Sequence, residues 1–175
     1  MKNILLMAAL AVILLASLVK ADSSRYDISA EIFNNNTAHY KLVMFFSNIT
    51  SQNVTIPIGL PSNVRVEPPN CEAMNGNLGT VVFCSLGSEN TSVAIEYDSD
   101  DVKLQSGYYL FSNSFKILNS TKAISVLVKL PEGSGLREPT EKSYSPEGAL
   151  IGSDGRRPII NWVVSDPKGD RFDVS

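Results

Sequence analysis

The segment ISVLVKL, residues 124–130, places an apolar residue at every second position: Ile124, Val126, Val128 and Leu130. A period of two is typical of a β-strand with one buried face. Proline and glycine follow at once in the sequence PEGSG, residues 131–135. They predict the end of the strand, since both residues break regular structure.

The same alternation occurs on both sides of this segment. Apolar residues with a period of two occur at 26–32, 40–46, 54–58, 64–66, 81–83, 93–97, 109–111 and 160–164. Short strands separated by turn residues are typical of an all-β fold. No stretch after residue 21 has a helical apolar stripe longer than two turns. We therefore expect one all-β domain over residues 22–175, an antiparallel β-sandwich that is immunoglobulin-like in style.

The N-terminus has the layout of a signal peptide. Lys2 precedes an uncharged apolar run from Ile4 to Val19, and Ala21 completes a cleavage site with small or medium residues before Asp22. The apolar run is about one turn shorter than the ~18–20 residues that span a bilayer. An uncleaved anchor and a buried helix are the alternatives for residues 1–21. The leader predicts an extracytoplasmic protein, secreted or at the cell surface.

The two cysteines, Cys71 and Cys84, fit that location. In an oxidising compartment, two cysteines are expected to form one disulfide. The sequence between them contains Asn75-Gly76, a strong hairpin signal, and Gly79. A redox-active or metal-binding pair is the alternative, but it would need closer spacing or more ligands.

The region after the leader contains five Asn-x-Ser/Thr sequons. Each falls at or near a predicted turn or strand end, where a glycan would face water. The alternative is ordinary turn chemistry, since Asn, Ser and Thr favour turns. The predicted glycosylation sites are Asn35, Asn48, Asn53, Asn90 and Asn119.

The charges favour neither nucleic acid nor an anionic membrane surface as a partner. The chain has a net charge of −3, and its basic residues are scattered rather than gathered in a stripe. Arg156-Arg157 follows the Asp154-Gly155 turn and could recognise an anion, although an exposed hairpin tip is the simpler interpretation.

The sequence contains no recognisable catalytic constellation. His39 is the only histidine, and no nucleophile-elbow motif accompanies it. Asp98-Ser99-Asp100-Asp101 could contribute to a Ca²⁺ site, but it lacks the EF-hand pattern, and we interpret it as a solvated loop. We expect no catalytic residue, no metal and no cofactor. A hydrolase that uses scattered carboxylates is the least favoured alternative.

Two further features concern the end of the chain. Trp162, the only tryptophan, lies between apolar residues on one strand face and is predicted to anchor the core. The segment 172–175 begins another alternating strand and then stops. We expect the domain to be truncated at this end, with a membrane anchor as one candidate for the continuation of the native chain.

Several of these motifs together resemble a known class of domain. They are VTIPI at 54–58, the hairpin between the cysteines, VKLPEG at 128–133, and SPEGA at 145–149 followed by SDGRR and IINW. The chain resembles the exported N-terminal β-sandwich of archaeal membrane-anchored surface or sensor proteins, some of which have a C-terminal winged-helix region. The resemblance implies a β-sandwich with a surface-sensing role and carries no site residue.

These observations predict a non-enzymatic cell-surface sensor or protein-interaction module. We expect a protein partner or self-association, and membrane association through the leader or a C-terminal anchor. The alternative is a structural subunit of an archaeal surface filament or layer that assembles by strand exchange. The donor strand would then be the segment after Asp22 or the one that ends at Ser175.

Overall fold

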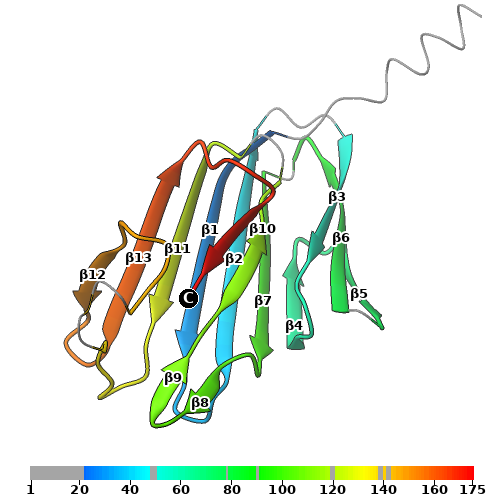
Figure 1. Ribbon diagram of the computed structural model, residues 1–175. Coiled ribbons are helices and arrows are strands. Elements are labelled where there is room, and N and C mark those ends of the chain that lie inside the picture. The colour runs from blue at the N-terminus through cyan, green and yellow to red at the C-terminus, as the bar shows by residue number, and fades with distance from the viewer. Residues whose placement is uncertain are drawn as a thin grey trace, which may run out of the picture.

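The computed structural model describes residues 22–47, 51–77, 79–89, 91–118, 121–137, 140 and 143–175 (Figure 1). The described chain is all-β and contains no α-helix, so it has no helix that could cross a bilayer. The predicted leader lies outside the described residues. The strands are β1 (Asp22–Ile32), β2 (Ala38–Ser47), β3 (Ser51–Pro57), β4 (Ser62–Glu67), β5 (Cys71–Gly76), β6 (Gly79–Gly87), β7 (Ser92–Ser99), β8 (Lys103–Gln105), β9 (Tyr108–Leu110), β10 (Asn113–Lys116), β11 (Ala123–Lys129), β12 (Leu150–Ser153), β13 (Pro158–Ser165) and β14 (Arg171–Val174).

A seven-stranded sheet forms the larger layer, in the order β12-β13-β11-β1-β2-β7-β4. β1 lies at its centre, where it pairs antiparallel with β2 and parallel with β11. The other neighbouring pairs in this sheet are antiparallel. The one parallel pair departs from the predicted antiparallel pattern. A parallel neighbour requires a long crossover, and here the crossover contains all the strands from β2 to β10.

The core lies on one face of this sheet, because alternate residues of each strand point to the same side. Tyr26, Ile28, Ala30 and Ile32 of β1 are each at most 2% exposed. The segment 124–130 behaves as its period predicts, with its first three apolar side chains buried and Leu130 half-buried.

The chain also forms three small sheets, β3-β6-β5, β10-β14 and β8-β9, of which β10-β14 belongs to the layer that faces the large sheet. Figure 1 shows β10 and β14 in front of β1 and β2. Phe115, Ile117 and Val174 of this layer belong to the same core cluster as the buried face of the large sheet. The predicted all-β sandwich is therefore confirmed, although one layer is a single seven-stranded sheet and the rest of the chain forms separate small sheets, unlike the two sheets of an immunoglobulin domain.

The predicted disulfide is present and joins neighbouring strands. Cys71 of β5 lies directly opposite Cys84 of β6, and their sulfurs are bonded. The hairpin turn lies two residues later than Asn75-Gly76, because Gly76 already pairs with Gly79. The Asn75 side-chain oxygen instead accepts a hydrogen bond of 2.7 Å from the Thr80 hydroxyl.

The C-terminal segment is part of the second layer. β14 pairs antiparallel with β10, and Val174 is 2% exposed. The backbones of Ser175 and Ser145 exchange two hydrogen bonds, of 3.0 and 2.8 Å. The Pro/Gly/Ser-rich segment from 131 to 149 contains no strand among its described residues, as its composition predicts.

Candidate functional site

The sequons are only partly covered by the structure. Asn35 and Asn53 are exposed, whereas Asn48, Asn90 and Asn119 lie outside the described residues. The Asn35 side-chain oxygen accepts a 2.7 Å hydrogen bond from the Thr37 hydroxyl within the same sequon. Glycosylation at all five positions stays a prediction.

His39 is held in a polar contact on the outer face of the large sheet. It lies on β2, an interior strand, and its Nδ1 is 2.7 Å from Asp98 Oδ1. Asn63 of β4 donates a 2.8 Å hydrogen bond to Asp98 Oδ2. Both contacts lower the pKa of the Asp98 carboxyl, and the hydrogen bond from Asn63 has the larger effect. The three side chains thus link neighbouring strands β2, β7 and β4.

The acidic segment 98–101 is a solvated loop only in part: Asp98 and Ser99 belong to β7, Asp100 is exposed, and Asp101 reaches into the domain. The Tyr40 hydroxyl donates a 2.8 Å hydrogen bond to Asp101 Oδ2, and Asn113 donates to both of these oxygens. Burial, and then the charge of Asp101, raises the pKa of Tyr40 far above its ordinary value. The described residues contain no group of three or more His, Cys, Asp or Glu side chains placed to hold a metal.

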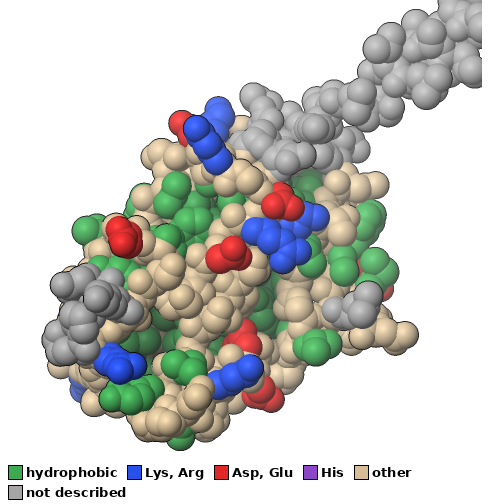
Figure 2. All heavy atoms as spheres, in the orientation of Figure 1, with side chains coloured by type: hydrophobic (Ala, Val, Ile, Leu, Met, Phe, Trp, Pro, Cys, Tyr) green, Lys and Arg blue, Asp and Glu red, His purple; other side chains and the backbone are tan. Residues whose placement is uncertain are grey.

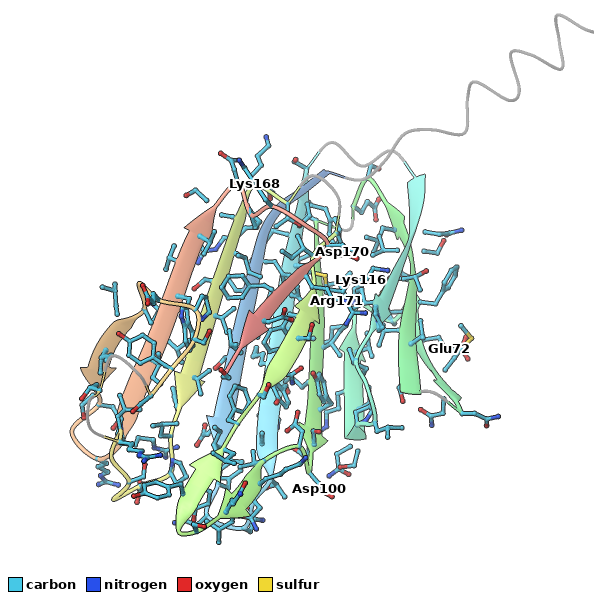
Figure 3. The ribbon with its side chains drawn as sticks, in the orientation of Figure 1. Glu72, Asp100, Lys116, Lys168, Asp170 and Arg171 are labelled. Carbon is cyan, nitrogen blue, oxygen red and sulfur yellow. A yellow bond between two sulfur atoms is a disulfide. The ribbon has the colours of Figure 1, made fainter. Side chains whose placement is uncertain are left out.

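A hollow of about 760 Å³ lies beside this network. Its lining includes Asp100, Asp173 and Lys116 together with Asp101. Figure 3 shows Asp100 near the end of β7, whereas Lys116 lies further up β10, beside Arg171 of β14. Acidic groups outnumber basic ones here, but Asp101 Oδ2 already accepts two internal hydrogen bonds.

The two arginines after the Asp154-Gly155 turn differ in their contacts. Arg156 is exposed, with 80% of its side chain accessible. Arg157 is 22% accessible and forms an ion pair with Glu31 of β1. Arg156 is therefore an exposed residue at the hairpin tip, as predicted, whereas Arg157 is not. Asp154 accepts hydrogen bonds from both backbone N–H groups, at 3.0 and 2.9 Å, and these bonds lower its pKa.

A second and larger hollow, of about 1020 Å³, is lined mainly by aromatic and aliphatic side chains, and we call it the aromatic groove. It runs between the β8–β9 hairpin and the segment 130–145, whose described residues form no strand. Figure 2 shows hydrophobic side chains reaching the surface on this side of the molecule, at the level of the hairpin. The lining includes the side chains of Tyr108, Tyr109, Phe111, Arg137, Tyr144 and Trp162.

The floor of the aromatic groove is the inner face of β11 and β13. Val128, Ile160 and Trp162 lie there and are each at most 4% exposed, because the alternation of both strands points them inward. The predicted role of Trp162 as a core anchor is confirmed. Its indole N–H donates a 2.7 Å hydrogen bond to the Pro146 carbonyl, and its ring meets Tyr144 edge to face at 6.3 Å.

One wall of the groove is the β8–β9 hairpin. Ser106 and Gly107 have φ angles of 52° and 79°, as a two-residue type I′ turn requires. The hairpin leaves apolar surface accessible, since Tyr108 is 49% and Leu110 46% exposed. The Tyr109 hydroxyl lies 3.4 Å from the Asn34 carbonyl oxygen, which ties the hairpin to the β1–β2 turn.

Arg137 gives the aromatic groove its charge. It is the one charged side chain among the described residues that line the groove. Its guanidinium carbon lies 5.2 Å from the centre of the Tyr108 ring, a distance typical of a cation–π contact. The edge of the guanidinium keeps N–H groups that can bind a carboxylate. The groove therefore suits an apolar ligand that also carries a negative charge.

Sequence reasoning did not find this groove. Its aromatic residues come from 108–111, 144 and 162, so only the folded chain brings them together. The Ser106-Gly107 pair was the one local signal, because it predicts a tight hairpin turn. The predicted sites, in contrast, are dispersed: neither the described sequon residues, Asn35 and Asn53, nor the disulfide lines the groove.

Comparison with known proteins defines the fold only. No family model and no curated protein matches the chain. Among solved structures, the chain is similar to a candidate nutrient binding protein from Legionella pneumophila, with a TM-score of 0.55 and 15% identity. It is also similar to an M1 zinc metallopeptidase from Deinococcus radiodurans, with a TM-score of 0.53 and 9% identity.

Both similarities extend over most of this chain but only part of the other. The alignment covers 88% of this chain and 66% of the Legionella protein. For the metallopeptidase, it covers 90% of this chain and 43% of the enzyme. At these identities the shared property is the β-architecture.

Proposed function

We propose that this protein is a non-enzymatic recognition module that works outside the cytoplasm. It binds an apolar, acidic peptide segment of a partner protein in the aromatic groove. The observation that carries the proposal is the lining of that groove: aromatic and aliphatic walls with Arg137 as the one charged side chain described there.

The extracytoplasmic location is supported by the predicted leader and by the disulfide. A disulfide between Cys71 and Cys84 is typical of proteins that fold in an oxidising compartment. The exposure of Asn35 and Asn53 is compatible with the predicted glycosylation. The resemblance to archaeal surface proteins supports a position at the cell surface.

A peptide suits the groove better than a sugar does. Each sugar hydroxyl needs a hydrogen-bond partner when it leaves water. The described lining has no carboxylate side chain and one side-chain amide, that of Gln105; its other polar side chains are Arg137 and the hydroxyls of serines and tyrosines. Leucine and aromatic side chains of a peptide would bury against Tyr108, Leu110 and Phe111, and an acidic side chain would reach Arg137.

The filament alternative has weaker support. Its two candidate donor segments already have partners within the chain: β1 pairs with both β2 and β11, and β14 pairs with β10. A strand lent to a neighbour would have to leave these ladders first.

The test uses Trp162 as a reporter, because it is the only tryptophan and lies on the groove floor. The purified protein is titrated with short synthetic peptides that combine Leu or Phe with Asp or Glu. We expect a change in tryptophan emission and saturable binding by calorimetry. Arg137→Gln should weaken binding by about tenfold, because it removes a charge-assisted hydrogen bond.

The matched control is Arg156→Gln, which removes an exposed arginine outside the groove. It should leave peptide affinity unchanged. The proposal is wrong if no acidic, apolar peptide binds, or if peptides with Lys in place of the acidic residues bind equally well.

A further inference from the structure

The two edges of the seven-stranded sheet are built differently. β4, at one edge, has a register shift between Ser62 and Arg65 and charged side chains at Arg65 and Glu67. Bulges and charges of this kind protect an edge strand from pairing with another chain. β12, at the other edge, pairs with β13 in regular register and carries no charge. No described strand lies beyond it.

β12 also leaves apolar side chains in solvent. Leu150 is 68% exposed and Ile151 is 45% exposed. Leu150 lies opposite Asn161, so it shares the outer face of the sheet with Val163, which is 65% exposed. β12 is short, with four residues, but it is accessible and uncharged, and its unpaired N–H and C=O groups can pair with a strand of another chain.

We propose that β12 is the interface of a homodimer, in which a second copy adds antiparallel to this edge. The two-fold axis would pass beside Ile151 and place it opposite the same residue of the other copy. Leu150 would then face Gly152, which has no side chain to obstruct it. The two large sheets would become one continuous sheet.

Charge complementarity selects the antiparallel arrangement. Glu147 precedes β12, and Arg156 follows it in the turn to β13; both are exposed. Antiparallel copies bring Glu147 of one chain next to Arg156 of the other, twice per dimer. Parallel copies would instead set like charges against each other. Among the described residues, Arg156 has one long ion pair, with Glu132 at 3.9 Å, and its side chain is 80% accessible, so it can reach a second copy.

Because the β4 edge is protected, this contact closes at two copies and does not propagate. The interface is also independent of the proposed peptide site, since no residue of β12 lines the aromatic groove. The two proposals can therefore fail separately.

The test is sedimentation equilibrium of the purified protein over a range of concentrations. We expect a monomer–dimer equilibrium for the wild type. Ile151→Lys should shift this equilibrium to the monomer, because the substitution places two ammonium groups opposite each other across the two-fold axis. The control is Leu60→Lys, which places the same charge at a residue 78% exposed in the loop between β3 and β4.

A charge-reversal exchange tests the register of the pairing. Glu147→Arg alone and Arg156→Glu alone should each weaken the dimer by about tenfold or more, because both contacts become repulsive. An equal mixture of the two variants should dimerise again, since each mixed dimer has two attractive contacts. A wild type that stays monomeric, a dimer that tolerates Ile151→Lys, or a mixture without recovery would overturn the proposal.

Discussion

Single side chains on the outer face of the large sheet link strands that are distant in sequence. The Asp98 carboxylate on β7 accepts a hydrogen bond from the side-chain amide of Asn63 on β4. Its other oxygen lies 2.7 Å from Nδ1 of His39 on β2. These partners favour the ionised carboxylate and so lower its pKa below the ordinary value. The resulting stabilisation is present above the unfolded-state pKa and is lost as the pH falls through the lower folded value.

This predicts the outcome of an NMR titration of the Asp98 carboxyl. In the wild type its pKa should lie below that of an unperturbed aspartate. In Asn63→Ala the pKa of Asp98 should rise toward the ordinary value, because the hydrogen bond that lowers it most is removed. Asn77→Ala, an exposed asparagine in the β5–β6 turn, is the control and should change nothing. Equal Asp98 pKa values in Asn63→Ala and wild type would contradict this assignment.

Gly79 is the residue whose backbone demands glycine most clearly. Its φ is +135°, and a Cβ there would lie 2.6 Å from the Gly59 carbonyl oxygen. That oxygen accepts the Thr80 N–H, so neither backbone can move away freely. We expect Gly79→Ala to lower the free energy of unfolding by about 1–3 kcal/mol. Denaturant unfolding measures this, with Gly87→Ala as the control, since nothing lies within 4 Å of a Cβ at that glycine.

At the scale of elements, the disulfide cross-links the β5–β6 hairpin at the end remote from its turn. The bond restricts the unfolded chain over a sequence separation of 13 residues. Its loss should therefore lower the free energy of unfolding by about 3 kcal/mol. We expect the denaturant midpoint of the wild type to fall when reductant is added. The Cys71→Ala/Cys84→Ala double variant should have a lower midpoint that reductant does not change, and equal midpoints for the oxidised and reduced wild type would contradict the argument.

The elements divide into those that local pattern predicts and those that it does not. The strand at 124–130 was predictable because four alternating apolar residues specify one buried face. β10, in contrast, has four residues and buries only Phe115, too short a run to show a period. On β6 the period itself is ambiguous, because apolar residues occupy both faces: Val82 is buried, whereas Phe83 is 36% exposed.

The aromatic groove belongs to the scale of the whole molecule. It exists because the second layer is smaller than the first and leaves part of β11 and β13 to be covered by the segment 130–145, whose described residues form no strand. Neither the size of a layer nor the partner of a strand is specified by local alternation. The sequence therefore predicted the sandwich and the disulfide, but it could not bring Arg137, Tyr108 and Trp162 together.

The central parallel pair has a consequence for the time course of folding. Tyr26 of β1 lies beside Ile124 of β11, about 100 residues later in the chain, and contacts this remote slow the search for the native topology. β1 and β11, in the middle of the large sheet, cannot pair until nearly three quarters of the polypeptide has been synthesised. The domain thus has little opportunity to fold while its first strands emerge. Such a delay is compatible with the proposed extracytoplasmic location, because an exported chain crosses the membrane before it folds.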